Sequence, residues 1–159
     1  MVLASGFFVF NTALAASPGD VVINEFSSDS SPEWVELRNT TASPIDLTGW
    51  KLTELTTPQE TPNEINLLSL SGTIPAGDVL AFDVGTIKLN NPGDSIGLFE
   101  GTNEINRVTY GTVTGMTADV GAPGVGQSAV FDGTSWSITS TPTKGYVASI
   151  VSDDPTLVD

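Results

Sequence analysis

The chain has 159 residues, with five lysines and arginines against 19 aspartates and glutamates, and a net charge of −14. It contains no histidine and no cysteine, which excludes Ser-His-Asp and Cys-His nucleophile systems, the usual zinc sites and a disulfide framework. The five lysines and arginines are scattered along the sequence, with no two adjacent. Because nucleic acids and anionic bilayers are bound through clustered Lys and Arg, we expect no nucleic-acid partner.

The first 15 residues are typical of a signal peptide. Val2–Phe10 is an apolar run too short to span a bilayer, and Ala13-Leu14-Ala15 is a small-x-small cleavage site. A basic start is missing, and a buried first strand is the alternative interpretation. The segment predicts export to the cell surface or the extracellular space, with cleavage after Ala15. No second apolar run of spanning length follows, so no membrane insertion is expected after cleavage.

The rest of the chain is dominated by short runs that favour β-strands. They are rich in Val, Ile, Thr, Phe and Trp, as pleated, half-buried surfaces are. Turn signals separate them: Pro-Gly-Asp within 17–20 and 91–94, the looser Pro-Ala-Gly-Asp at 75–78, and Asp-Gly at 132–133. This pattern predicts an all-β sandwich. The expected strands are 21–26, 34–39, 50–55, 79–84, 95–100, 105–110 and 128–131.

The strand at 34–39 supplies the candidate binding residues. Alternation places Val35 and Leu37 on one face, toward the core, and Trp34, Glu36 and Arg38 on the other. We therefore expect Trp34 to be partly exposed and Glu36 to be a surface glutamate, and we assign all three outward residues to a binding surface. In the run at 50–55, Trp50 and Leu52 share a face, which we place in the core.

Glu25 and Glu36 lie on strands that are expected to be neighbours, so their carboxylates could approach each other. A catalytic carboxylate pair would also need a cleft and one acid with a raised pKa. A sandwich of this size leaves little chain with which to build a cleft. We therefore interpret both glutamates as structural and predict that the protein is not an enzyme.

Calcium is the remaining candidate ligand. Asp29 and Glu33 lie in one loop, and Asp153-Asp154 in the C-terminal segment, but no loop carries the closely spaced oxygens of a calcium site. We expect no cofactor and no dedicated metal site, and at most weak calcium binding that folding does not require.

Four segments together resemble the lamin tail domain family, in the form of its exported bacterial members: 21–26, 34–52, 89–111 and 128–145. The chain departs from the family pattern at Lys144, where a second proline is usual, and in 128–131, which lacks a common basic residue. The resemblance implies an immunoglobulin-like β-sandwich over 16–146, without catalytic residues, followed by an acidic tail or linker at 147–159.

The function implied by the resemblance is a binding or adhesion module for an extracellular protein, a glycan or the cell envelope. The alternative is an accessory domain of a secreted metal-dependent hydrolase or nuclease, with the catalytic part outside this chain.

Overall fold

The computed structural model describes residues 15–145, except for 56–64 and residue 87. The described residues form antiparallel strands and no helix, in agreement with the predicted all-β fold. The strands are β1 (Val21–Ser27), β2 (Glu33–Asn39), β3 (Ile45–Asp46), β4 (Trp50–Leu55), β5 (Ile65–Ser69), β6 (Thr73–Ile74), β7 (Val79–Gly85), β8 (Gly93–Glu100), β9 (Asn103–Gly111), β10 (Ser128–Phe131) and β11 (Trp136–Thr139).

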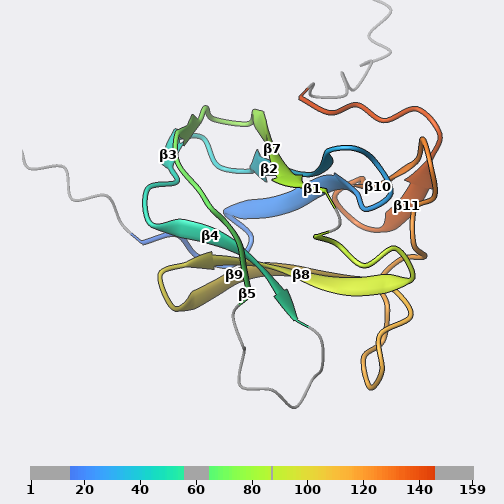
Figure 1. Cartoon of the computed structure of the whole chain (residues 1–159). Helices are drawn as coiled ribbons and strands as arrows, with labels where there is room; N and C mark the ends of the chain where they lie inside the picture. Colours follow the sequence, from blue (N-terminus) through green and yellow to red (C-terminus); the bar gives the residue numbers. More distant parts are fainter. Residues whose placement is uncertain (1–14, 56–64, 87, 146–159) are drawn as a thin grey trace, which may run out of the picture.

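Two sheets stack face to face (Figure 1). The five-stranded sheet has the order β11-β10-β1-β2-β7, and the four-stranded sheet has the order β5-β4-β8-β9. The short strands β3 and β6 pair with each other. The order is non-sequential, since β1 at the start of the domain pairs with β10 near its end. The predicted sandwich is therefore confirmed.

The core lies between the two sheets. The predicted core positions Trp50 and Leu52 are both buried. Phe26 of β1 packs against Tyr110 of β9 with ring centroids 4.8 Å apart, which joins the two layers through an aromatic pair. The other core residues on the central strands include Val21, Ile23, Val35, Leu37, Ile96, Leu98 and Val108.

The predicted turns close as their residue types require. In the turn at 17–20, Gly19 takes a φ of 95°, and the Asp20 amide donates to the Ser17 carbonyl at 3.0 Å. In the turn at 75–78, Gly77 takes a φ of 72°. Residues with a Cβ rarely adopt such angles, so glycine is what allows the chain to reverse at these two points.

The seven expected strands are all present, with bounds that differ by a few residues. The strands β3, β5, β6 and β11 were not among them. Residues 1–14 of the predicted signal peptide and the predicted tail at 147–159 lie outside the described residues. Within the described ranges, no helix is long and apolar enough to cross a membrane.

Candidate functional site

The outer face of β2 carries the three predicted binding residues, and the alternation that placed them there is confirmed. Val35 and Leu37 lie in the core cluster, whereas Trp34, Glu36 and Arg38 do not. The predicted exposure is wrong for two of the three. Trp34 is 5% exposed and Glu36 is fully buried.

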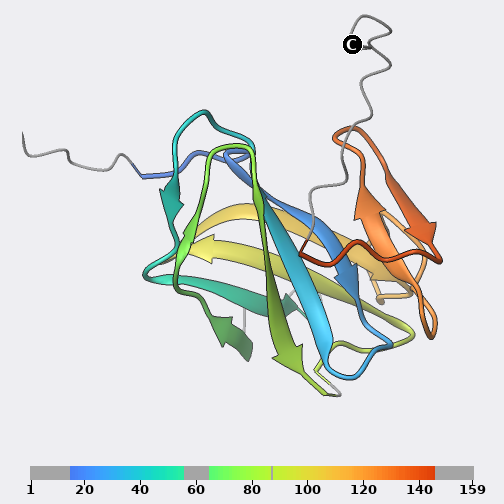
Figure 2. The same cartoon turned by 90° about the horizontal axis from the view of Figure 1, so that it is seen from above.

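A segment from the end of the domain covers these two residues. Residues 140–145, which we call the C-terminal strap, follow β11 and run back across the outside of β1 and β2 (Figure 2). The Thr143 amide and hydroxyl donate to Glu25, at 3.0 and 2.6 Å. The Gly145 amide donates to Glu36 Oε2 at 2.6 Å. Part of the outer face of β2 is therefore buried as well, beneath the C-terminal strap.

Glu25 and Glu36 are direct cross-strand neighbours. Their position depends on a bulge in β1, where Asn24 is the extra residue between Ile23 and Glu25. The bulge lets Ile23 and Phe26 both face the core and turns Glu25 to the outer face. The Asn24 amide then donates to Glu36 Oε1 at 2.7 Å.

The two carboxylates are occupied by structural donors. Besides Thr143, Glu25 accepts a hydrogen bond of 2.5 Å from the Ser128 hydroxyl. Burial raises the pKa of Glu36; the hydrogen bonds from Gly145 and Asn24 oppose this rise, and the charge of Glu25 adds to it. These hydrogen bonds attach the strap to both carboxylates, so the pair holds the strap in place.

Lys144 of the C-terminal strap packs over the side chain of Trp34. The Lys144 ammonium lies 5.6 Å from the centroid of the Trp34 ring and forms an ion pair with Asp83 on β7. These contacts cover the indole from outside. Trp34 therefore leaves the group of candidate binding residues.

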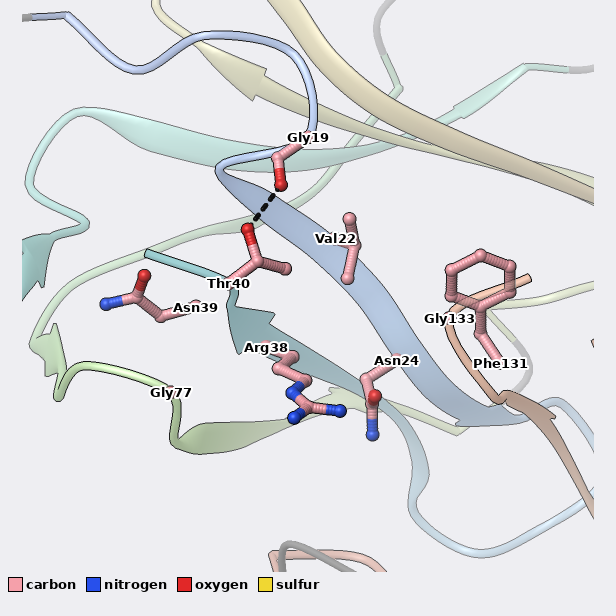
Figure 3. Close-up of a pocket in the computed structure, with 9 residues that line it drawn as sticks. All are labelled: Gly19, Val22, Asn24, Arg38, Asn39, Thr40, Gly77, Phe131 and Gly133. Carbon is pink, nitrogen blue, oxygen red and sulfur yellow. Dashed lines mark hydrogen bonds between the residues drawn. The ribbon is translucent and has the colours of Figure 1, made fainter. Parts of the chain in front are cut away.

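Arg38 lies beyond the strap and remains half-buried at the edge of an open hollow. The hollow has a volume of about 340 Å³ and is lined by Gly19, Val22, Asn24, Arg38, Asn39, Thr40, Gly77, Phe131 and Gly133 (Figure 3). Among the described residues, no hydrogen bond or ion pair holds the Arg38 guanidinium. The hydroxyl of Thr40 fixes one rim by donating to Gly19 O at 2.6 Å.

Two kinds of surface meet in the Arg38 hollow. Val22 and the ring of Phe131 are apolar, while Arg38 and the Asn24 amide are polar (Figure 3). Sequence reasoning missed Asn24 and Phe131 because they belong to different strands. The signal that could have found Asn24 is the irregular spacing of apolar residues in 21–26, which indicates a bulge. An arrangement of this kind can bind an anionic group attached to an apolar ring or chain.

The acidic loop does not form a compact metal centre. The Glu33 carboxylate accepts from the amides of Lys88 and Leu89 at 2.7 and 2.9 Å, and Asp29 accepts from the Asn91 side chain at 2.9 Å. In the described ranges, no group of three or more acidic side chains is arranged to hold a metal ion. Asp153 and Asp154 lie outside those ranges, and weak calcium binding stays a prediction.

A second pair of buried acids, Asp94 and Glu54, was not predicted. The Asn90 side chain donates to both carboxylates, at 3.1 Å to Asp94 and 2.9 Å to Glu54. Burial raises the pKa of Asp94 to about 7, and the neighbouring charge of Glu54 adds to the rise. The Tyr110 hydroxyl donates to Asn90 O at 3.0 Å, so this pair fixes a turn against the core and is not part of the Arg38 hollow.

Comparison with protein families finds a match to the lamin tail domain over residues 15–112, more than half of the chain. The chain belongs to the lamin tail domain family. The resemblance of its motifs is thus confirmed, and the immunoglobulin-like sandwich is compatible with a non-catalytic module. Comparison with curated proteins finds no match. The lamin tail domain match ends before β10, so the strap and Phe131 lie outside the matched residues.

Proposed function

We propose that the protein is an exported, non-catalytic binding module that holds an acidic glycan by a sugar carboxylate in the Arg38 hollow. The observation that carries this proposal is a guanidinium that has no partner among the described residues, placed in a hollow of a protein with a net charge of −14. The leader-like residues 1–15 support export, and the lamin tail domain supports a module without catalytic residues.

Arg38 has no acidic partner in the described ranges, whereas Arg107 and Lys144 each pair with an acidic side chain. Arg107 is held by two hydrogen bonds to the Glu104 carboxylate, at 2.9 and 2.6 Å, and Lys144 is held by Asp83. Acidic side chains are abundant, and yet none in the described ranges pairs with Arg38. Because a guanidinium binds carboxylates through two parallel hydrogen bonds, Arg38 is available for a carboxylate that comes from outside.

The other residues that line the hollow favour a ligand in which the carboxylate is attached to a sugar ring. Phe131 offers an aromatic face on which a sugar can pack, and Asn24, whose side-chain nitrogen already donates to Glu36, offers its side-chain oxygen to a sugar hydroxyl. A volume of about 340 Å³ lies at the small end of the range for ligand pockets, roughly 300–1,000 Å³. The hollow thus suits about one or two sugar units of a chain that continues along the surface.

The overall charge shapes how such a ligand would bind. A net charge of −14 repels an acidic polymer at long range, and salt at physiological strength screens this repulsion beyond about 8 Å. The contact between Arg38 and a carboxylate is short and is screened less. Affinity should therefore change little, or rise, between low and physiological salt, which is the opposite of binding through a basic patch.

The test is calorimetric titration with an oligosaccharide of uronic acids and with the same oligosaccharide after reduction of its carboxyl groups. We expect binding of the acidic form only, with a loss of at least about tenfold in Arg38→Met, as expected for a charged hydrogen-bonded pair. Arg107→Met is the matched control, because it removes an equal charge outside the hollow.

Equal binding of the two oligosaccharides, or equal losses in the two arginine variants, would contradict the proposal. A peptide with a free C-terminal carboxylate serves as the second probe. If the peptide binds through Arg38 and the glycan does not, the hollow is a peptide site and the glycan assignment is wrong.

A further inference from the structure

The segment before β1 is anchored at the end of β8. The backbone nitrogen of Ala16 donates to Glu100 Oε2 at 3.0 Å, although 84 positions separate the two residues. The Ala16 side chain packs against the core cluster. The next residue is also held, because the Ser17 amide donates to Asp20 Oδ2 at 2.8 Å. The position of the Ala16 nitrogen is therefore set by contacts on both sides of it.

The surroundings of this nitrogen are acidic. It lies in a hollow of about 340 Å³ whose charged lining residues are Asp20, Asp46 and Glu100, with no lysine or arginine among the residues that line it. Hydrogen bonds from Thr48 lower the pKa of Asp46, so this carboxylate is ionised over a wide pH range. One of these carboxylates, Glu100, accepts directly from the nitrogen, and the other two add negative charge to the same hollow, which favours a cation over a neutral amide.

We propose that the peptide bond between Ala15 and Ala16 is hydrolysed during export, and that the new α-ammonium group of Ala16 forms an ion pair with Glu100. Water adds across the bond, the new carboxylate leaves on Ala15 with residues 1–15, and the amino group stays on Ala16. A leader peptidase that accepts small residues at the first and third positions before the bond would find Ala15 and Ala13 there.

Two further observations support this start. An α-amino group with its ordinary pKa of about 7.7–8.0 is largely protonated at neutral pH, so cleavage converts one neutral donor into a charged group with three. The lamin tail domain match covers residues 15–112, so residues 1–14 lie outside it. The inference rests on the export part of the proposed function and not on ligand binding by Arg38.

The first experiment expresses the full 159-residue chain in a secreting bacterial host and measures the mass of the exported protein. We expect a chain that starts at Ala16. A different start, or retention of the full chain, would overturn the inference. Glycan binding by the uncleaved chain is measured separately, so a wrong start and a wrong ligand give different results.

The second experiment measures the pKa of the α-amino group in the exported protein, by nitrogen NMR across a pH series. We expect a value at least about half a unit above the ordinary range, because Asp20, Asp46 and Glu100 favour the charged form. In Glu100→Gln the value should fall back toward that range. Glu104→Gln, which removes an exposed carboxylate outside the hollow, should leave it unchanged. An α-amino pKa within the ordinary range, or equal effects of the two variants, would overturn the ion pair.

Discussion

The outer face of β2 has a covered half and an open half. Trp34 and Glu36 lie beneath the C-terminal strap, where Gly145 and Lys144 contact them. Arg38, two residues further along the same face, lines a hollow that the strap does not reach. The three side chains share one strand, one face and one sequence pattern, and yet the strap covers two of them, while the third has no hydrogen-bond or ion-pair partner among the described residues.

The difference shows that alternation identifies the face of a strand and not what covers it. Burial of the outer face comes from a segment more than 100 residues away in sequence, as the separation between Glu36 and Gly145 shows. A sandwich face is therefore available for binding only where no other part of the chain crosses it. Tests of this comparison should separate residues under the strap from residues in the core and from residues in the open half.

Replacing the two tryptophans should have the largest effect on the free energy of unfolding. Trp50→Ala removes a side chain from the core between the sheets and should lower the free energy of unfolding by about 3–5 kcal/mol. Trp34→Ala should cost less, about 2 kcal/mol, because the strap can close over part of the space that the indole leaves. Urea unfolding of the two variants measures both values.

A cost below about 0.5 kcal/mol for Trp34→Ala would mean that the indole is an ordinary surface residue and that the strap does not cover it. Equal losses in the two variants would place Trp34 within the core. Either result would break the distinction between the covered half of β2 and the centre of the sandwich.

The attachment of the strap gives the next effect. Glu25→Gln weakens the acceptor of the Thr143 hydrogen bonds and should cost about 2 kcal/mol, since hydrogen bonds to charged groups contribute about 1.5–3 kcal/mol. A looser strap exposes the bond after Lys144, so we expect faster tryptic cleavage at Lys144 in the folded protein. The control is Glu104→Gln, which removes an exposed carboxylate. Cleavage at the same rate in both variants would show that Glu25 does not hold the strap.

These residues also show how far sequence reasoning reaches. Short-range patterns predicted the turns, the inward positions of Val35 and Leu37, and all the strands except β3, β5, β6 and β11, because alternation and turn geometry are local. The strap has no periodic pattern, and its amides meet Glu25 and Glu36 only after folding. The Arg38 hollow joins Asn24 and Phe131, which lie on separate strands. Exposure depends on such long-range contacts, so the predicted exposure was wrong for Trp34 and Glu36, while the binding role of the face stays a prediction.

The smallest effect is a pH dependence that Glu36 contributes. Burial and the adjacent Glu25 charge raise the pKa of Glu36 in the folded protein above its ordinary value of 4.5, although the Gly145 and Asn24 hydrogen bonds oppose the shift. A group whose pKa is raised by folding contributes stability that is fully present below its unfolded pKa. That contribution is lost as the pH rises through the folded pKa, because the buried side chain must then carry its charge.

Glu36→Gln removes this charge and leaves an acceptor for the Gly145 amide. We therefore expect the stability of the wild-type protein, relative to Glu36→Gln, to decrease as the pH rises from 4 to 7. Urea unfolding at a series of pH values measures the difference, and taking the difference cancels the contributions of carboxylates that lie away from Glu36 and are shared by the two proteins. Glu25→Gln should destabilise the protein at pH 7, while Glu36→Gln should be nearly neutral there. A relative stability that increases with pH would show that the hydrogen bonds to Glu36 outweigh its burial, and that the strap stabilises the charged form of Glu36.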